Sequence, residues 1–234
     1  MAARRTLYGR RQGRPLRAGR KALLRDALPQ LEIELPEDGG PEGGRLRPGD
    51  LFDPPPPALF LEIGFGGGEH LAWQMARHPE AGFLAAEYFI TGVASLLGQL
   101  PQGGKEALLR LYIGDARDLL ECLPDAVLDR IFILFPDPWP KRRHHKRRLI
   151  QRETLDLLAR VLKDGGELRF GTDDPGYLDW ALQRLSAHPD FAWQVGGPDD
   201  WRQRPADWPA TRYEEKALKA GRRPAYLRFL RRAR

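Results

Sequence analysis

The chain has 234 residues, of which 38 are Lys or Arg and 32 are Asp or Glu, so its formal net charge is +6. This length suits one large domain or two small ones, with room for a sizeable core. The longest purely apolar run is Ile131–Phe135, whereas a membrane helix needs about 20 residues. We therefore expect a soluble protein with no membrane partner.

Cysteine and histidine usage excludes several other classes. Cys122 is the only cysteine, which excludes an intramolecular disulfide and a cysteine-based metal cluster. The five histidines show no spacing typical of a zinc site, so no metal is expected. The basic first 25 residues contain no apolar segment of the kind found in secretory signals, and a cytoplasmic location is expected.

Basic residues are concentrated in three tracts that contain no acidic residue. Residues 1–25 carry nine, residues 141–152 carry seven and residues 219–234 carry seven. The tracts together hold a charge of +23, and the rest of the chain holds −17. Such segregation is typical of proteins that bind polyanions, because each phosphate contact releases counterions. Solvated surface charge is the alternative interpretation.

Composition also divides the chain. Residues 1–25 are rich in Arg and Gly and predict a basic, flexible arm. Residues 26–57 predict a Gly/Pro-rich linker, with regular structure improbable over 36–57. Residues 58–234 predict the main folded domain, which ends in a basic C-terminal tail.

Within that domain, short apolar runs alternate with helical patterns. Strands are predicted at 58–63, 81–86, 109–113, 127–135 and 167–170. Helices are predicted at 70–77, from 88 to 100, at 147–162 and at 177–185. This alternation predicts an α/β fold, a Rossmann-like, doubly wound and mostly parallel sheet with helices on both faces. Residues 191–195 and 225–230 predict two late strands, an antiparallel pair at the sheet edge.

The first predicted strand ends in a G-x-G-x-G turn made by Gly64, Gly66 and Gly68, with Glu62 two residues before it. The dinucleotide fingerprint would need a glycine where Glu69 stands, and a carboxylate there would repel a pyrophosphate. A ligand without phosphate but with a cationic centre fits better. S-adenosylmethionine is such a ligand, and Glu62 could orient its amino-acid end.

Carboxylates also follow the next two predicted strands. Glu87 lies 19 residues after Gly68, where a carboxylate can accept both ribose hydroxyls. Asp115 follows the third strand and is placed to accept from the adenine amino group. Each residue alone could be an ordinary turn former or helix N-cap. Their recurrence at three strand ends favours a cofactor site.

The loop after the fourth predicted strand is the most specific segment. Three prolines at 136–140 restrict the backbone and hold the loop in one shape around Asp137. The basic run 141–148 follows directly. A carboxylate beside a phosphate-binding cluster indicates an active site that acts on nucleic acid. His144 and His145 are interpreted as phosphate or sugar contacts rather than catalysts. An ordinary Asp-Pro turn is the alternative.

These motifs resemble the bacterial tRNA (guanine-N(7)-)-methyltransferases. The resemblance rests on EIGFGGGEHL at 62–71, FPDPWPKRRHHKRRLIQ at 135–151, Gly171-Thr172-Asp173, and Thr211-Arg212-Tyr213-Glu214. It covers about residues 58–230. It implies a class I methyltransferase fold in which S-adenosylmethionine methylates guanine 46 in the variable loop of tRNA.

The resemblance also implies roles for individual residues. Asp137 is implied as the catalytic residue, and the implied cofactor side comprises Glu62, Gly64, Gly66, Gly68, Glu87, Asp115 and Asp137. The implied substrate-binding residues are Lys141, Asp173, Thr211, Arg212, Tyr213 and Glu214. The implied RNA-contacting residues are Arg143, His144, His145, Lys146, Arg147 and Arg148.

The chemistry of guanine bears on the role of Asp137. Guanine N(7) already holds an in-plane lone pair, so methyl transfer to it needs no general base. Asp137 is therefore expected to orient groups and stabilise developing charge, while Glu214 or Asp173 could accept from the Watson–Crick donors of guanine. Two alternatives stay open. One is methylation of an exocyclic amine, although the families that do this carry Asp/Asn-Pro-Pro-aromatic. The other is a non-catalytic RNA-binding module.

Overall fold

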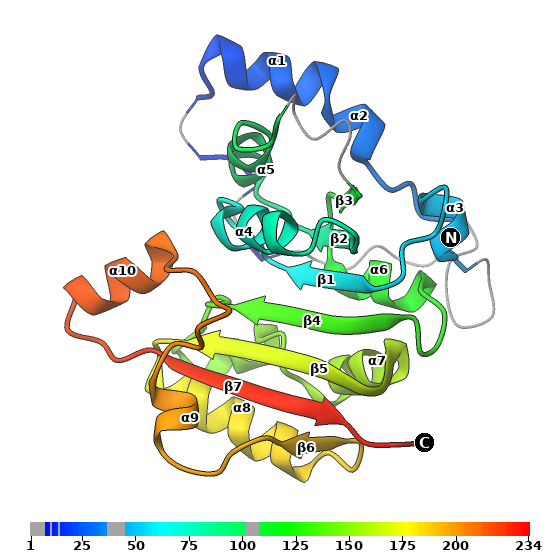
Figure 1. The fold of residues 1–234 in the computed structure, drawn as a ribbon. Helices are drawn as coiled ribbons and strands as arrows, with labels where there is room; N and C mark the ends of the chain where they lie inside the picture. The colour runs from blue at the N-terminus through cyan, green and yellow to red at the C-terminus, as the bar shows by residue number, and fades with distance from the viewer. Residues whose placement is uncertain (1–7, 10, 14, 37–44, 102–107) are drawn as a thin grey trace.

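A computed structural model describes residues 8–9, 11–13, 15–36, 45–101 and 108–234. The described residues form a seven-stranded sheet in the order β3-β2-β1-β4-β5-β7-β6 (Figure 1). The strands are β1 (Leu59–Ile63), β2 (Gly82–Ala86), β3 (Leu109–Tyr112), β4 (Leu128–Leu134), β5 (Leu162–Thr172), β6 (Phe191–Trp193) and β7 (Ala225–Arg231). Strands β1 to β5 are parallel, whereas β7 runs antiparallel to both β5 and β6. The predicted mostly parallel sheet and its antiparallel late strands are confirmed.

Helices cover both faces of this sheet. Helices α4 (Glu69–Arg77) and α5 (Ile90–Leu97) pack on one face, and α6 (Ala116–Cys122), α7 (Arg152–Val161) and α8 (Pro175–Ala187) pack on the other. The remaining helices are α1 (Ala18–Asp26), α2 (Leu28–Leu31), α3 (Pro48–Leu51), the 3-10 helix η2 (Arg142–Arg147), α9 (Asp199–Arg202) and α10 (Arg212–Lys219). The described residues contain no helix that is long and apolar enough to span a membrane.

The strand order reverses at the centre of the sheet. The chain runs outward from β1 through β2 to β3 and then returns to place β4 on the other side of β1. Ligands of open α/β sheets bind where the order reverses, beyond the carboxyl ends of the strands. In Figure 1 the arrowheads of β1, β4 and β5 point to one side of the molecule, and α10 lies at that side.

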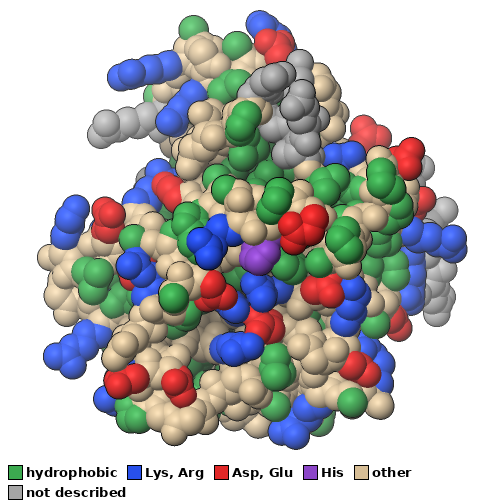
Figure 2. All heavy atoms as spheres, viewed as in Figure 1, with side chains coloured by type: hydrophobic (Ala, Val, Ile, Leu, Met, Phe, Trp, Pro, Cys, Tyr) green, Lys and Arg blue, Asp and Glu red, His purple; other side chains and the backbone are tan. Residues whose placement is uncertain are grey.

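Charged side chains, rather than a helix, lie on β4, β5 and β7 over part of the face that carries α4 and α5. Arg130 of β4 and Arg169 of β5 both pair with Glu167, at 3.0 and 2.9 Å, and the Arg228 guanidinium of β7 joins them at 2.8 Å. Figure 2 shows Lys or Arg and Asp or Glu side chains intermixed over the face viewed in Figure 1. The ion pairs thus join three neighbouring strands.

The chain before β1 differs from the expected arm and linker. Within the expected arm, residues 1–7, 10 and 14 lie outside the described residues, and the described part includes α1, which packs against α5. The expected linker, apart from residues 37–44, which also lie outside, is tied to the body by backbone bonds: Ile33 N–H donates to the Leu111 carbonyl at 2.7 Å. Apolar side chains explain this docking, because the following become buried: Leu28, Leu31, Ile33, Leu46 and Phe52.

The basic C-terminal tract is only partly a free cationic surface. Arg231 is buried and pairs with Asp164 at 3.3 Å. Arg234 also pairs with Asp164, and its guanidinium donates to the Leu162 carbonyl at 2.9 Å. Most of the tract lies in β7 and the residues after it, so these arginines secure the end of the chain to the α7–β5 junction.

Several helices and boundaries differ from the sequence prediction. The pattern over 147–162 predicted one helix, but α7 begins only at Arg152, since η2 ends at Arg147 and residues 148–151 are not helical. β5 begins at Leu162, earlier than predicted. Helices α6 and α10 were not predicted. Both are short and begin at capping side chains, Asp115 and Thr211, which accept from backbone N–H groups.

The contact between α5 and the glycine turn provides a test of this packing. A Cβ added at Gly92 of α5 would lie 1.9 Å from the Gly66 carbonyl oxygen, which is backbone. We expect Gly92→Ala to destabilise the protein by about 1–3 kcal/mol through overpacking. The thermal midpoint should then fall by about 2–4 °C per kcal/mol.

The matched control is Gly98→Ala at the end of the same helix, where the nearest atoms would lie at 3.6 Å. Alanine there should leave the midpoint unchanged or raise it slightly, since it restricts the unfolded chain. Equal midpoints for the two variants would contradict the described approach of α5 to the turn.

Candidate active site

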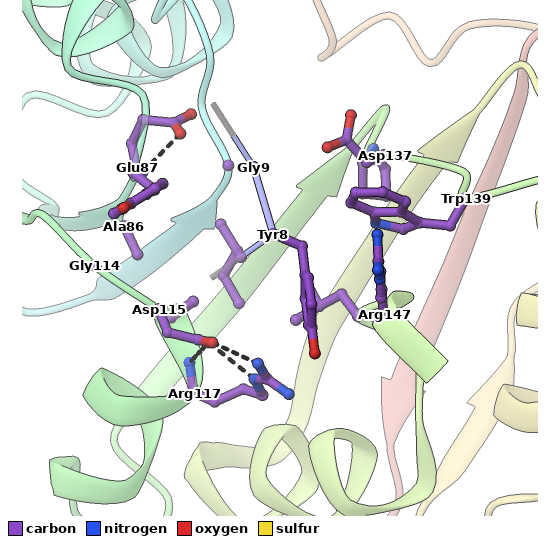
Figure 3. Close-up of a pocket in the computed structure, with 16 residues that line it drawn as sticks. Tyr8, Gly9, Ala86, Glu87, Gly114, Asp115, Arg117, Asp137, Trp139 and Arg147 are labelled. Atoms are coloured by element: carbon purple, nitrogen blue, oxygen red, sulfur yellow. Dashed lines mark hydrogen bonds and ion pairs between the residues drawn. The ribbon is translucent and has the colours of Figure 1, made fainter. Parts of the chain in front are cut away.

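A cavity of about 220 Å³ lies at the reversal point of the sheet (Figure 3). Four predicted cofactor residues line it, namely Gly64, Glu87, Asp115 and Asp137. Its other lining residues are Tyr8, Gly9, Ile63, Ala86, Tyr88, Gly114, Ala116, Arg117, Pro136, Trp139, Arg147 and Leu149. The strand ends therefore bring three of the predicted carboxylates to one cavity.

Glu87, after β2, is held by backbone donors. One oxygen accepts from Tyr88 N–H and Phe89 N–H at 2.7 and 2.9 Å, and the other accepts from Gly66 N–H at 2.7 Å. A carboxylate has about four acceptor positions, so one position is left for a further donor. Burial raises the pKa of Glu87 above its ordinary value despite these donors, and the nearby charge of Asp137 adds to the rise.

Asp115, after β3, is buried and caps α6 by accepting from Arg117 N–H at 3.0 Å. The Arg117 guanidinium also binds both carboxylate oxygens, at 2.9 and 2.5 Å. Figure 3 shows this pair on the opposite side of the cavity from Asp137. The capping role explains why Asp115 stands at the start of α6.

Asp137 projects from the loop after β4. It has no hydrogen-bond partner among the described residues, and partial desolvation by its surroundings raises its pKa. Phe135 and Trp139, on either side of it, have φ angles of 50° and 44°, which are unfavourable for residues other than glycine. The Phe135 N–H donates to the Gly171 carbonyl at 2.7 Å. The loop is thus strained but anchored to β5.

The glycine turn after β1 is shaped by close packing. Gly64, Gly66 and Gly68 all have positive φ. A Cβ at Gly66 would lie 2.7 Å from the Tyr213 ring of α10, whereas a Cβ at Gly64 would meet nothing within 4 Å. Gly66 therefore lies beneath α10, and Gly64 faces the open cavity.

Glu62 lies elsewhere. It is buried and pairs with His70 Nδ1 of α4 at 2.7 Å. Glu62, Gly66 and Gly68 are not among the described residues that line the cavity. The predicted contact between Glu62 and the amino-acid end of a cofactor thus stays a prediction, and no sequence motif indicated that His70 would be the partner of Glu62.

The basic run after the loop forms η2, and its members differ in environment. Arg143 and Lys146 are exposed. The Arg147 guanidinium stacks on the rings of Tyr8 and Trp139, at 4.2 and 5.0 Å from their centroids. It therefore reaches the edge of the cavity, where Figure 3 places it beside both rings.

The two histidines of this run each contact a tryptophan. His144 packs edge-on against Trp139 at 5.9 Å, and His145 packs against Trp180 at 5.2 Å. Slight desolvation, and then the charges of neighbouring basic residues, lower the pKa of His144. A charged imidazolium is therefore disfavoured at His144.

Arg148 differs in environment from the other predicted RNA-contacting residues. Its side chain is buried, and its guanidinium donates to the Pro138 carbonyl at 2.8 Å and to the Gly176 carbonyl at 3.1 Å. It also stacks on Tyr177 and Trp180, each at 5.0 Å. Arg148 is therefore directed into the protein and supports the Asp137 loop from beneath.

The predicted substrate residues of α10 lie over the glycine turn. Thr211 caps the helix, Arg212 pairs with Glu69 at 3.2 Å, and Tyr213 lies against Gly66. Glu214 is buried and accepts from the Tyr226 hydroxyl at 2.6 Å.

The other two predicted substrate residues lie outside α10. Lys141 is exposed at the start of η2. Asp173 follows β5 and pairs with Arg222 at 2.5 Å. Both stand at the carboxyl-end side of the sheet, with the cavity residues.

The sequence analysis missed the contribution of the arm to the cavity. Tyr8 and Gly9 line it, and the Ile90 N–H at the start of α5 donates to the Arg11 carbonyl at 2.9 Å. One feature of the sequence could have indicated this contact, because Tyr8 is the only aromatic residue among the first 25. An isolated aromatic in a polar segment is a candidate anchor.

The cavity fits the cofactor that the resemblance implies. The carboxylates of Glu87 and Asp137 suit a cationic ligand, whereas Asp115 is paired with Arg117. The apolar side chains of Ile63, Ala86 and Leu149 offer a surface for a flat ring. Gly64 leaves open space beside them. The described residues contain no group of three or more potential metal ligands among their His, Cys, Asp and Glu side chains.

Comparison with known proteins places the chain in a family. Residues 57–226 match a family model described as "Putative methyltransferase". A tRNA (guanine-N(7)-)-methyltransferase of Rhodospirillum rubrum is 56% identical over 97% of this chain and 88% of its own length. Relatives of the same name from Brucella anthropi and Paramagnetospirillum magneticum are 48% and 47% identical. They are matched over 96% and 100% of this chain and over 94% and 95% of their own lengths.

Solved structures with low sequence identity share the fold. An antibiotic-related methyltransferase aligns with a TM-score of 0.51 at 15% identity, over 83% of this chain and 98% of its own. A variant of the 16S rRNA (adenine(1408)-N(1))-methyltransferase of Catenulisporales acidiphilia aligns with a TM-score of 0.50 at 17% identity, over 83% and 96%. The fold is that of the class I S-adenosylmethionine-dependent methyltransferases.

The buried position of Arg148 can be tested by stability alone. Arg148→Met leaves the Pro138 and Gly176 carbonyls without their donor, and we expect a loss of about 1–3 kcal/mol. The control is Arg143→Met, an exposed neighbour whose loss should change stability by less than about 0.5 kcal/mol. Thermal unfolding measures both, and an unchanged midpoint for Arg148→Met would show that this side chain does not support the loop.

Proposed function

The chain belongs to the tRNA (guanine-N(7)-)-methyltransferase family. From this premise we propose that it transfers a methyl group from S-adenosylmethionine to N(7) of guanine 46 in the variable loop of tRNA. One observation carries the proposal: a cavity lined by carboxylates adjoins the cationic helix η2, and Asp137 lies at the junction. A cationic methyl donor and a polyanionic acceptor would meet there.

The cofactor supplies a methyl group on a positively charged sulfonium. The chain supplies negative potential from Glu87 and Asp137, whose carboxylates line the cavity, whereas the charge of Asp115 is paired with that of Arg117. Since Glu87 has one acceptor position left beside its three backbone donors, it would accept one ribose hydroxyl rather than the two expected from the sequence. Asp115 would stand near the adenine.

Asp137 would act on charge rather than on a proton. The lone pair of guanine N(7) is available at neutral pH, so the reaction needs no base. During transfer the positive charge moves from sulfur toward the guanine ring. A fixed carboxylate beside that path stabilises the transition state, most strongly where water is partly excluded. The strained loop between Phe135 and Trp139 supports this role, because it fixes the position of Asp137.

Two carboxylates could read the Watson–Crick donors of guanine, and their exposure favours one. Both already accept a hydrogen bond, Asp173 from Arg222 and Glu214 from Tyr226. The Asp173 side chain is 23% exposed, whereas that of Glu214 is 5% exposed. We therefore assign base reading to Asp173. Glu214 would hold α10 against β7.

The cationic surface would bind the tRNA backbone. Lys141, Arg143 and Lys146 are exposed beside the cavity. Arg147 is held between Tyr8 and Trp139, so it can present charge at the mouth of the cavity. His144 and His145 would add neutral contacts to phosphate or sugar. Phosphate contacts of this kind set the position of the RNA rather than its sequence.

The nucleoside product tests the proposal directly. Unmodified tRNA transcripts incubated with the protein and methyl-labelled S-adenosylmethionine should yield 7-methylguanosine after digestion. A transcript with adenine in place of guanine 46 should take up no label and serves as the control. Label in any other nucleoside, or no label at all, would contradict the proposed reaction.

Asp137→Asn tests the proposed electrostatic role. The substitution removes the charge and keeps the side-chain shape, so turnover should fall by about 100-fold or more, as for other preorganised electrostatic groups. The affinity for tRNA should stay unchanged, because η2 is untouched. Single-turnover methylation and a filter-binding titration provide the two measurements. Turnover within threefold of the wild type would mean that Asp137 only shapes the loop.

A further inference from the structure

A chain of buried polar groups runs from β1 to the segment before α10. Glu62 of β1 binds His70 Nδ1 at 2.7 Å, and Gln74 Nε2 lies 3.1 Å from His70 Nε2. Gln74 Nε2 also donates to the Asp207 carbonyl at 2.9 Å. We call these four residues the Glu62–Asp207 chain. Its three side chains are each no more than 3% exposed, so water does not compete for their hydrogen bonds.

The direction of the hydrogen bonds follows from the last member. A backbone carbonyl can only accept, so the Gln74 atom that faces Asp207 is the amide nitrogen. The same nitrogen faces His70 Nε2, which must then be the accepting nitrogen of a neutral ring. The proton of His70 is therefore on Nδ1, and it is donated to Glu62. One residue fixes the orientation of the next along the whole chain.

Aromatic packing continues the connection to α10. Trp208, next to Asp207, has its ring 5.6 Å from that of His70 and 5.3 Å from that of Tyr226. The Tyr226 hydroxyl donates to Glu214 of α10 at 2.6 Å. The strand that leads into the glycine turn is thus linked, contact by contact, to the helix that lies on that turn.

Stability alone explains this arrangement poorly. Among the described residues, Gln74 Oε1 and Trp208 Nε1 are buried without a hydrogen-bond partner, and each such atom costs free energy. Buried polar networks are often no more stable than apolar packing of the same volume, but they fix side chains in one orientation. Orientation is therefore the property that the Glu62–Asp207 chain provides.

We propose that His70 is a positioning residue for the methyl transfer. Through Nδ1–H it holds the Glu62 carboxylate at the glycine turn, and through Gln74 it holds the segment at Asp207 that leads to α10. The cofactor side and the predicted substrate residues of α10 would thereby keep a fixed relative position. This inference rests on the proposed function and assigns His70 no contact with either substrate.

Three variants separate the bond from His70 to Glu62 from the link between His70 and Asp207. His70→Asn keeps an N–H close to the position of Nδ1 and loses the bond to Gln74. His70→Gln places an acceptor near the position of Nε2 and loses the donor to Glu62. Gln74→Met keeps the volume and removes the tie to Asp207.

Calorimetry with S-adenosylmethionine alone measures the effect of the bond between His70 and Glu62 on cofactor affinity. His70→Gln should weaken cofactor affinity by about tenfold or more, since a buried charge-assisted hydrogen bond is lost. His70→Asn and Gln74→Met should stay within about threefold of the wild type. Steady-state methylation of tRNA measures the effect of the link from His70 through Gln74 to Asp207. His70→Asn and Gln74→Met should raise KM for tRNA by about fivefold or more, with kcat within about threefold, because one neutral hydrogen bond to the segment before α10 is lost.

A merely structural His70 would give another pattern. Equal losses in His70→Asn and His70→Gln, or unchanged cofactor affinity in folded His70→Gln, would overturn the inference. If His70→Gln does not fold, Gln74→Met still decides, because an unchanged KM for tRNA in that variant would overturn it as well. Failure of the proposed function is distinguishable, since the wild type itself would then yield no 7-methylguanosine from tRNA.

Discussion

The reversal of strand order between β1 and β4 is the constraint on which the rest of the structure depends. Because β1 to β5 are parallel, the residues after each strand meet at one edge, however far apart they lie in the sequence. Glu87, Asp115 and Asp137 reach one cavity for this reason. The glycine turn after β1 then admits two helices at close range, with Gly92 of α5 against its backbone and Tyr213 of α10 against Gly66. The shape of the backbone and the placement of the charges have a common cause.

Opposite charges lie close together at this edge, and only some of them pair: Asp115 binds Arg117, whereas Asp137 and Arg147 form no ion pair with each other. Asp137 has no hydrogen-bond partner among the described residues, and nearby Arg147 stacks between two aromatic rings. The loop that carries Asp137 has two non-glycine residues with positive φ, and such strain persists only where the surroundings hold it. The anchors here are the Gly171 carbonyl and the buried Arg148. The loop thus keeps an acidic cavity and a cationic surface adjacent and separate.

The sequence could predict the location of those residues whose position depends only on local features of the chain. A carboxylate after an apolar run is a local feature, so Glu87, Asp115 and Asp137 could be placed at strand ends and were found together. It could not predict roles that depend on tertiary packing. Glu62 faces a histidine of α4. Arg148 is buried, although the residues next to it in the basic run include exposed ones of the same charge. A run of basic residues carries no signal for which of them turns inward. The docking of α1 and of the segment before β1 likewise depends on partners that lie far along the chain.

The pH dependence of ligand binding tests the central claim, that the cavity is a site for a cation. Burial raises the pKa of Glu87 and of Asp137, and for Glu87 the charge of Asp137 adds to this. A bound sulfonium favours the ionised carboxylates and so releases protons. Affinity for S-adenosylmethionine should therefore rise with pH from the ordinary carboxyl range, about 4, until both groups are ionised. S-adenosylhomocysteine, whose sulfur is neutral, should show a much weaker rise in calorimetric titrations over the same range. The same pH dependence for both ligands would contradict the account.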